Sequence, residues 1–297
     1  MEKETACSYT ITAGDAITVD DAITAGDAIT ADDAITADDV ITADDAITAD
    51  DAIIHSEIAG PKGAPVFVLL HGNGEDLHVF DRQMTCLSKF YRTIAVDTRG
   101  HGQSTRGVAP FTFHTFASDL LAVLDALQVE KAHLVGFSDG AITALHFALT
   151  APQRIQSMVL LGANFNPKGL RLSARLQICL AYACLSLAAP FSPKIRKKKE
   201  IWGLMVFQPN LTEADIARIA VPTLVVTGEN DLVSQRHNDG ISRLIAGAKR
   251  LVIPKGDHFW MFNQPETFNE MLLHQHEVTD SNLFPKENND PSVRVSV

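Results

Sequence analysis

The chain has 297 residues, 46% of them hydrophobic, which is enough for one large globular domain with a sizeable core. Its formal net charge of −11 comes from residues 11–53, which contain 12 aspartates and no lysine or arginine. The rest of the chain contains 24 acidic and 25 basic residues. This nearly neutral remainder has no basic face or stripe, so nothing in it predicts a nucleic-acid-binding protein.

The cysteines and the first residues indicate the compartment. Four cysteines are present, Cys7, Cys86, Cys179 and Cys184. They have neither the spacing of a metal site nor the density of a small disulfide scaffold, which favours free thiols. Residues 1–12 lack the basic and apolar regions of a signal peptide, so we expect a cytoplasmic protein.

A hexapeptide close to Ile-Thr-Ala-Asp-Asp-Ala repeats from residue 11, with isoleucine at every sixth position up to Ile53. An even period keeps these isoleucines on one face of a strand, whereas on a helix each is rotated by about 120° from the last. A stacked β-solenoid is therefore conceivable. The aspartates occupy positions where a hexapeptide coil needs small residues, and the composition is monotonous, so we expect disorder or loose structure over residues 1–46.

The rest of the chain alternates between strand and helix patterns. Residues 53–60 form an alternating edge strand before Pro61, and six apolar runs follow, at residues 66–70, 93–96, 132–136, 157–161, 223–227 and 250–253. Between the second and third of these runs, apolar residues recur at helical spacing from Phe116 to Leu127. This alternation predicts a parallel sheet covered by helices.

One segment interrupts the alternation and divides the domain. We expect a first part of an α/β core at residues 47–163, a helical cap at 164–220 and a second part of the core at 221–276. A carboxy-terminal tail follows at residues 277–297.

The strongest catalytic motif follows the predicted strand at residues 132–136. It reads Gly136-Phe137-Ser138-Asp139-Gly140 and leads into a helical pattern. A strand, G-x-S-x-G and a helix form a turn so tight that side chains two residues before and two residues after the serine would collide, and glycine avoids this. The serine hydroxyl then projects above the sheet. Ser138 is the predicted nucleophile. The helix directs its first N–H groups, that of Asp139 foremost, toward an oxyanion at the attacked carbonyl.

A serine nucleophile needs a base, most often a histidine with a pKa near 6.5. His258 follows the last predicted strand directly, as the chain order serine, acid, histidine requires. The acid that orients this imidazole is expected at a neighbouring strand end, where Gly228-Glu229-Asn230-Asp231 follows residues 223–227. We favour Asp231 over Glu229.

Four landmarks occur in one order: His71-Gly72-Asn73-Gly74, the run from Asp97 to Ser104, the elbow, and the acid and base. In these the chain resembles the α/β-hydrolase superfamily over roughly residues 52–274, specifically its small cap-bearing hydrolases: esterases, enol-lactonases, C–C hydrolases and cofactor-free haloperoxidases. The resemblance implies a mostly parallel, doubly wound sheet with a helical cap inserted after the sixth strand. It also implies that the backbone N–H of Asn73 completes the oxyanion hole with that of Asp139, and that His71 and His101 hold loops around the site.

The cap carries two unusual stretches. Residues 176–191 are mostly apolar but, at about 16 residues, fall short of the roughly 20 that span a bilayer, so no membrane span is expected. A helix that packs its apolar faces on the core and over the site is favoured over a membrane-facing lid. The basic run at residues 194–199 is more typical of a solvated turn or helix face than of a site for an acidic lipid or substrate. Phe137, Trp202 and Phe259 are the candidate substrate-binding residues.

We therefore expect a serine hydrolase that acts on an ester-like carbonyl of a small, mainly apolar substrate, with Ser138, Asp231 and His258 as its triad. No residue cluster predicts a metal and no glycine-rich loop predicts a dinucleotide, so no cofactor is expected. Epoxide hydrolase and dehalogenase chemistry is disfavoured because those relatives carry aspartate at the elbow.

Three alternatives stay open at this point. The same triad serves enzymes that cleave a C–C bond or an enol-lactone. A binding protein that retains the pocket while catalysis is slow is the second alternative, and an acidic interaction or cation-binding arm in the repeat is the third. The oligomeric state is not predicted.

Overall fold

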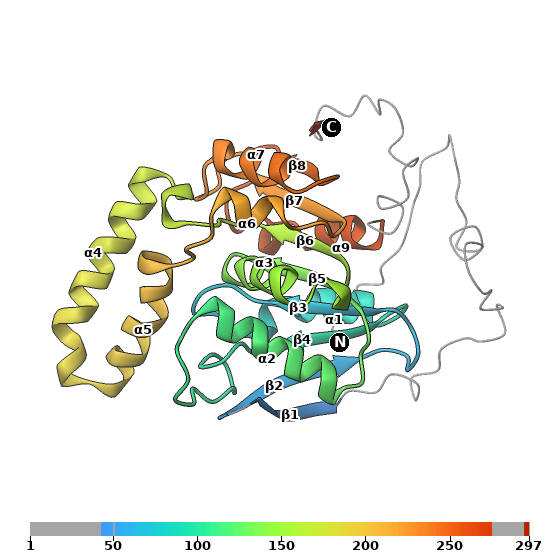
Figure 1. Ribbon diagram of the computed structural model, residues 1–297, viewed down its shortest axis with the longest axis horizontal. Helices are drawn as coiled ribbons and strands as arrows, with labels where there is room; N and C mark the ends of the chain where they lie inside the picture. The colour runs from blue at the N-terminus through green and yellow to red at the C-terminus, as the bar shows by residue number, and fades with distance from the viewer. Residues whose placement is uncertain (1–42, 50, 275–293, 297) are drawn as a thin grey trace, which may run out of the picture.

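The structure is a computed structural model that describes residues 43–49, 51–274 and 294–296. Its strands form one sheet in the order β1-β2-β4-β3-β5-β6-β7-β8-β9 (Figure 1). The strands are β1 (Ala43–Ala49), β2 (Ala52–Ala59), β3 (Val66–Leu70), β4 (Arg92–Val96), β5 (Ala132–Phe137), β6 (Ile155–Leu161), β7 (Thr223–Gly228), β8 (Lys249–Ile253) and β9 (Arg294–Ser296).

The middle of the sheet is parallel and its edges are antiparallel. Strands β4, β3, β5, β6, β7 and β8 run parallel, whereas β1 pairs with β2, β2 with β4, and β9 with β8 in antiparallel fashion. Every residue of β5 and of β7 is buried. Such continuous apolar runs are what strands covered on both faces require.

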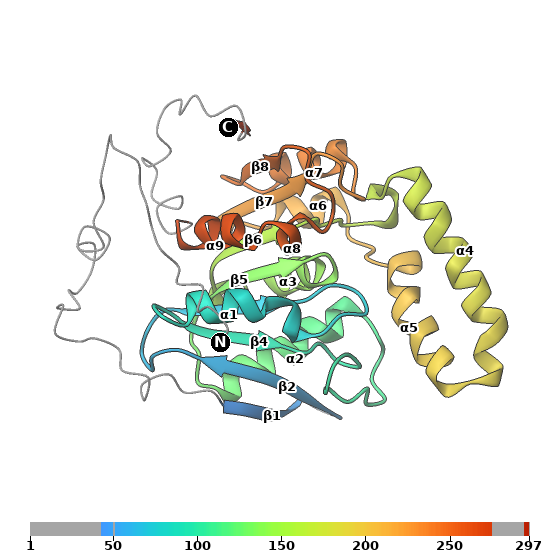
Figure 2. The ribbon, with the colours of Figure 1, turned by 180° about the vertical axis from the view of Figure 1, so that it is seen from behind.

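Helices cover both faces of the sheet. The helices of the described residues are α1 (Asp81–Leu87), α2 (Phe113–Ala126), α3 (Asp139–Thr150), α4 (Leu172–Ala188), α5 (Pro193–Phe207), α6 (Glu213–Ala217), α7 (Gln235–Leu244), α8 (Trp260–Asn263) and α9 (Pro265–Leu273). Helices α2, α3, α6 and α7 pack on one face (Figure 1), and α1, α8 and α9 pack on the other (Figure 2). Each face therefore has its own apolar core.

The expected α/β-hydrolase fold is confirmed. The predicted strands lie within one to two residues of β2 to β8, and the predicted helix near residues 116–127 is α2. The segment expected as a cap, residues 164–220, lies between β6 and β7 and contains α4, α5 and α6. The short α6 belongs to the core, because Ile216 is fully buried on the sheet.

The two ends of the chain differ in part from expectation. Disorder or loose structure does not hold for Ala43 to Ala46, which belong to β1. An edge strand exposes unpaired N–H and C=O groups, and this end of the repeat satisfies those of β2 while it buries Ile47 and Ala49. In the expected tail, residues 294–296 form β9. The predictions for residues 1–42 and for the rest of the tail concern segments outside the described residues.

The expectation for the apolar cap helix is wrong. Helix α5 contacts the core through Leu204, which packs with Phe113, Phe116 and Ile142. Helix α4, in contrast, buries only Ala174. It packs on α5, where the rings of Tyr182 and Phe207 are 5.2 Å apart. Because α5 lies between α4 and the sheet, the outer side of α4 is left in solvent, as both views show (Figures 1 and 2).

Candidate active site

The candidate site lies where the parallel strands end. In the register of the sheet, Leu70 of β3 pairs with Gly136 of β5, and Leu161 of β6 pairs with both Phe137 of β5 and Val226 of β7. The carboxyl ends of these strands therefore meet at one edge, which is where open α/β sheets place their ligand sites. The loops that carry the predicted residues all open there.

Ser138 stands on the turn from β5 to α3 with φ 53° and ψ −113°, in a region that non-glycine residues rarely adopt. The turn tolerates no side chain two residues before or two residues after it. A Cβ on Gly136 would lie 2.5 Å from Gly140, and a Cβ on Gly140 would lie 2.0 Å from the carbonyl oxygen of Leu70. The two glycines thus let α3 cross close above β3 and β5 and hold the serine at the apex.

The structure brings the three predicted catalytic residues together from three loops. His258 Nε2 is 3.1 Å from Ser138 Oγ, and His258 Nδ1 is 2.7 Å from Asp231 Oδ1. Both His258 and Asp231 are buried. With the Nδ1 proton donated to Asp231, the imidazole presents the Nε2 lone pair to the serine hydroxyl, which is the geometry of general-base catalysis.

The Asp231 side chain is held in place by backbone N–H groups of its own loop. Its Oδ1 accepts a hydrogen bond from Val233 N at 3.0 Å, and its Oδ2 accepts one from Gly228 N at 3.3 Å. The rival carboxylate, Glu229, is exposed and accepts a hydrogen bond from Lys255 N at 2.8 Å. Of the two candidates, Asp231 is therefore the one that contacts His258.

Gly162 is a further requirement of the site that sequence reasoning missed. It follows β6 with φ +60°, and a Cβ on it would lie 2.6 Å from Cε1 of His258. Any side chain at this position would displace the imidazole. The available signal was its place at the carboxyl end of a predicted strand.

The predicted oxyanion donors lie beside the serine. Asp139 is the first residue of α3, and Asn73 lies in the loop after β3. Within the described residues, neither backbone N–H donates to another group of the protein. The Asn73 side chain donates to Asp139 Oδ2 at 2.8 Å and to the carbonyl oxygen of Ile201 at 2.9 Å. This amide joins the elbow to helix α5 of the cap and so anchors the loop after β3 beside the residue that follows Ser138.

Two carboxyl groups next to the triad have raised pKa values. Burial raises the pKa of Asp139 to about 7, although the hydrogen bond from Asn73 opposes part of the shift. Burial also raises the pKa of Glu75, whose Oε2 accepts a hydrogen bond from Gly72 N at 2.9 Å. Sequence reasoning missed Glu75, although it directly follows the His-Gly-Asn-Gly motif. Because the pKa of Asp139 is about 7, the surroundings of Ser138 gain negative charge as this carboxyl ionises near neutral pH.

Two buried histidines tie the surrounding loops together, as the resemblance implied. His71 Nδ1 donates to the carbonyl oxygen of Gly72 at 2.8 Å, and its Nε2 accepts from Thr98 N at 3.0 Å. His101 Nδ1 lies 3.1 Å from Thr98 Oγ1. Burial lowers the pKa of both rings, so they serve as neutral hydrogen-bonding groups.

The three candidate substrate residues lie in different surroundings. Phe137 is 1% exposed and packs behind His258, with ring centroids 5.0 Å apart, so it supports the imidazole from within the core. Phe259 is 45% exposed with its ring 5.2 Å from that of His258, and it is the aromatic face open beside the base. Trp202 is half-buried on α5.

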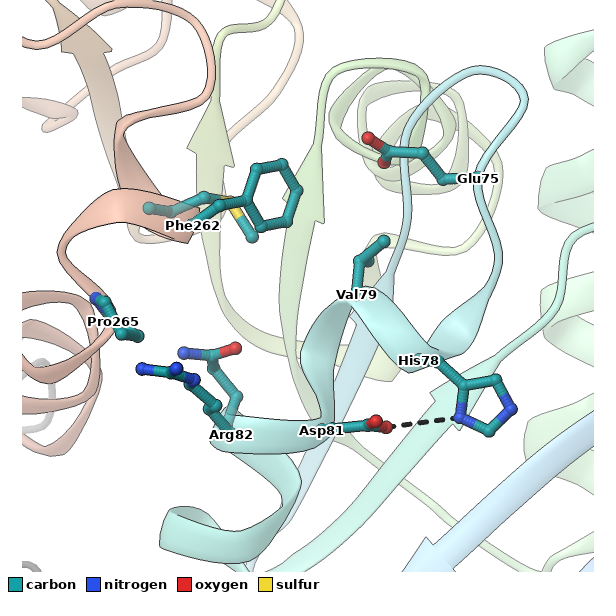
Figure 3. Close-up of a pocket in the computed structure, with 9 residues that line it drawn as sticks. Glu75, His78, Val79, Asp81, Arg82, Phe262 and Pro265 are labelled. Atoms are coloured by element: carbon teal, nitrogen blue, oxygen red, sulfur yellow. Dashed lines mark hydrogen bonds and ion pairs between the residues drawn. The ribbon is translucent and has the colours of Figure 1, made fainter. Parts of the chain in front are cut away.

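A pocket of about 460 Å³ lies behind this centre, between η2 (Leu77–Phe80), α1 and α8 (Figure 3). Its lining includes Glu75, Val79 and Phe262, together with the polar side chains of His78, Asp81 and Arg82. Ser138, Asp231 and His258 are not among its lining residues. Phe262 packs edge-on against Phe137 at 5.4 Å, so the aromatic cluster behind His258 separates the pocket from the triad.

The described part of the chain contains no group of three or more histidine, cysteine or acidic side chains suited to hold a metal ion. Of the cysteines in that part, Cys86 is buried, while Cys179 and Cys184 are exposed on α4.

Comparisons with known proteins agree with this fold. A family model described as the alpha/beta hydrolase fold matches residues 65–177. The chain is 28% identical to 3-oxoadipate enol-lactonase 1 of Acinetobacter baylyi, over 73% of this chain and 90% of that protein. It is 25% identical to a carboxylesterase of Bacillus subtilis, over 74% of this chain and 82% of that protein. The crystal structure of a hydrolase from Pseudomonas aeruginosa superposes with a TM-score of 0.63 at 27% identity, covering 80% of this chain and 98% of that one.

Proposed function

The chain belongs to the α/β-hydrolase superfamily and is a hydrolase, and on this premise we propose that it is a serine hydrolase that cleaves an ester-like carbonyl through an acyl-enzyme. One observation carries the proposal. The Ser138 hydroxyl, the His258 imidazole and the Asp231 carboxylate form a continuous hydrogen-bonded chain, with distances of 3.1 and 2.7 Å. This arrangement suits an activated serine nucleophile.

The first half of the reaction forms the acyl-enzyme. His258 Nε2 accepts the Ser138 proton while Oγ attacks the substrate carbonyl, and the backbone N–H groups of Asn73 and Asp139 stabilise the oxyanion. The tetrahedral intermediate collapses and His258 donates the proton to the leaving alcohol. Asp231 keeps the imidazole oriented and stabilises its charged form.

The second half releases the acid. Water gives a proton to His258 and attacks the acyl carbonyl, and the same two N–H groups hold the second oxyanion. Collapse of this intermediate breaks the bond to Ser138 Oγ, which takes its proton back from His258. The net reaction consumes one water and yields a carboxylic acid and an alcohol.

The substrate class rests on similarity and on the open face of the site. The relatives reported above include a carboxylesterase and an enol-lactonase, both of which cleave an acyl–oxygen bond. Phe259 presents an exposed aromatic ring beside the base. We therefore propose a small, mainly apolar ester as the substrate.

Enol-lactone or C–C bond cleavage with the same triad is the second candidate. It is favoured by the 28% identity to 3-oxoadipate enol-lactonase 1, which extends over 90% of that protein. Turnover of esters, enol-lactones and β-diketones by one preparation distinguishes the two candidates. In either case, Ser138→Ala is expected to remove the activity.

The test is labelling of the purified full chain with a fluorophosphonate, together with hydrolysis of short p-nitrophenyl esters. We expect labelling of the wild type and none of Ser138→Ala or His258→Ala. Ser118→Ala and His114→Ala are matched controls, because these residues are exposed on α2 and are expected to leave labelling unchanged.

Labelling that requires both Ser138 and His258 supports the proposal and leaves the substrate to be found. A folded wild type that resists the probe and hydrolyses no ester would contradict it. That outcome would favour a binding protein on a hydrolase scaffold.

A further inference from the structure

The outer surface of the cap presents an unusually apolar helix. Helix α4 continues through η5 (Ala189–Phe191), so residues Leu172–Phe191 form one apolar helical segment of 20 residues, long and apolar enough by composition to cross a membrane. The side chains that remain exposed are large: Leu172 (69%), Leu176 (62%), Leu180 (67%), Leu187 (78%) and Phe191 (87%). We call these five residues the apolar stripe.

The stripe occupies one side of the helix. At about 100° per residue, its positions fall within a sector of roughly 100°. The opposite side, which includes Tyr182, packs on α5, where the tyrosine ring lies beside Gly203 and Phe207. Exposed apolar patches of this extent on a soluble protein mark interaction sites.

A basic cluster adjoins the stripe at the tip of the hairpin that α4 and α5 form. Lys194, Arg196, Lys197 and Lys198 follow Phe191 within seven residues and are all exposed. Within the described residues, none of the four forms an ion pair. The hairpin has a single acidic residue, Glu200, and its carboxylate is bound to Arg106 at 2.7 Å. The tip therefore carries an uncompensated positive charge beside exposed leucine and phenylalanine.

We propose that this hairpin, residues 172–207, docks on the surface of an anionic phospholipid bilayer. The apolar stripe enters the boundary between headgroups and acyl chains, and the basic cluster binds the lipid phosphates. Apolar area and attraction to anionic lipids together are what hold interfacial helices on membranes.

The connection of the hairpin to the core excludes a transmembrane arrangement of α4. If α4 spanned the bilayer, α5 would have to cross back to reach α6. Helix α5 has 15 residues, about 22 Å at 1.5 Å per residue, against a hydrocarbon core of about 30 Å. Its first half also carries the basic cluster, which is costly to bury in hydrocarbon. The hairpin therefore lies on the membrane surface.

Charge favours a bilayer over the same face of a second copy of this chain as the occupant. A protein partner would have to offer acidic groups beside an apolar surface. The same face of another copy offers lysine and arginine, and its one acidic side chain is engaged. Lipid headgroups supply the missing negative charge directly above an apolar layer.

Docking at this face would act close to the candidate active site. The carbonyl oxygen of Ile201 in α5 accepts a hydrogen bond from the Asn73 side-chain amide. Asn73 lies in the loop after β3, and its backbone N–H is one of the two proposed oxyanion donors. Arg106, which binds Glu200, joins the hairpin to the loop after β4. The inference does not depend on the proposed hydrolase chemistry, because binding is measured without turnover.

The experiment is vesicle flotation of the full chain, with vesicles of phosphatidylcholine alone and of phosphatidylcholine with 30% phosphatidylserine. We expect flotation with the mixed vesicles, at least tenfold weaker flotation with phosphatidylcholine alone, and weakening by 0.5 M NaCl. Leu180→Gln/Leu187→Gln and Lys194→Glu/Lys197→Glu/Lys198→Glu are each expected to reduce binding to mixed vesicles at least tenfold.

Matched controls replace equally exposed residues elsewhere. Phe90→Gln/Val108→Gln removes two exposed apolar side chains, and Lys62→Glu/Lys89→Glu/Lys131→Glu makes the same change of net charge. Both are expected to float like the wild type, and circular dichroism in solution reports whether each variant is folded.

Two outcomes would overturn the proposal. One is wild-type protein that stays unbound with both kinds of vesicle. The other is a stable dimer in sedimentation that Leu180→Gln/Leu187→Gln converts to a monomer, which would assign the stripe to a second copy of the chain.

Discussion

Helices α3 and α4 are both built largely from leucine, alanine and other apolar residues, yet they have opposite surroundings. Nine of the 12 residues of α3 are buried, because it packs against β3, β5, β6 and α2. Of the 17 residues of α4, only Ala174 is buried. Apolar composition therefore indicates that a helix needs a non-aqueous environment but not where it finds one. The chain itself supplies that environment for α3 and leaves the outer side of α4 open.

Charges follow the same division. In the core, the fully buried Arg99 guanidinium binds Asp51 and Asp119, both at 2.6 Å. Its hydrogen bond holds the pKa of the Asp51 carboxyl well below the usual range. At the hairpin, Arg106 and Glu200 form a partly exposed pair and the basic cluster is unpaired. The core thus satisfies its charges internally, whereas the hairpin presents them outward.

The largest expected effect tests the catalytic side of this comparison. Asp231→Asn is expected to lower kcat by about three to four orders of magnitude, because the imidazole loses its orienting carboxylate. Steady-state ester hydrolysis measures the loss. Glu229→Gln, in an exposed residue of the same loop, is the matched control and is expected to stay within about threefold of the wild type. Equal losses in the two variants would contradict the assignment of Asp231.

Removal of one partner from each kind of ion pair compares core and hairpin electrostatics. Asp119→Ala leaves the buried Arg99 guanidinium with one partner fewer and is expected to cost about 3 to 5 kcal/mol of unfolding free energy. Glu200→Ala breaks a pair whose side chains are 31% and 40% exposed and is expected to cost less than about 1 kcal/mol. Urea unfolding measures both losses. Similar values would mean that the pair at the hairpin is buried in solution.

The same truncation in the two helices compares their packing directly. Leu145→Ala in α3 removes a fully buried side chain and is expected to cost about 2 to 5 kcal/mol. Leu180→Ala in α4 removes a side chain that is 67% exposed and is expected to change stability by less than about 0.5 kcal/mol. A large loss for Leu180→Ala in the free protein would show that another surface already covers the stripe.

Asp139, next to the candidate active site, is expected to make stability depend on pH, whereas the lysines of the hairpin are not. Because burial raises the pKa of Asp139 from 3.8 to about 7, the folded state binds this proton more tightly than the unfolded state. Stability from this group is therefore complete below about pH 4 and is lost, by up to a few kcal/mol, as the pH rises to 7. Asp139→Asn removes the loss, so the difference from the wild type in urea unfolding changes between pH 4 and pH 7.5.

The buried histidines contribute the same pH dependence to the wild type and to Asp139→Asn. Their contribution therefore cancels in the difference between the two unfolding free energies. Lys194→Gln, an exposed change in the hairpin, is expected to keep the wild-type profile. A constant difference between Asp139→Asn and the wild type across this range would contradict the raised pKa.

Local patterns explain what could be predicted. The strands were predictable because apolar runs with two covered faces have a recognisable composition. The elbow was predictable because only glycine fits at positions 136 and 140 around Ser138. The places of Asp231 and His258 followed from chain order after strands β7 and β8, since the carboxyl ends of parallel strands meet at one edge.

Long-range contacts explain what was missed. Asp51 looks like any other aspartate of the repeat, yet it binds Arg99 because β1 returns along β2. Gly162 is required only because His258, almost a hundred residues later, packs against it. Glu75 binds the backbone of Gly72 through a turn that no periodicity reveals.

The amino-acid sequence by itself determined the order of strands and helices, the nucleophile elbow and the candidates for acid and base, because each depends on residues close in the chain. Only the tertiary structure decided which apolar segment is covered. It places α5 between α4 and the core, and so leaves Leu180 and its neighbours exposed. Burial is a relation between distant segments, and hydrophobicity along the chain measures only the tendency to seek it.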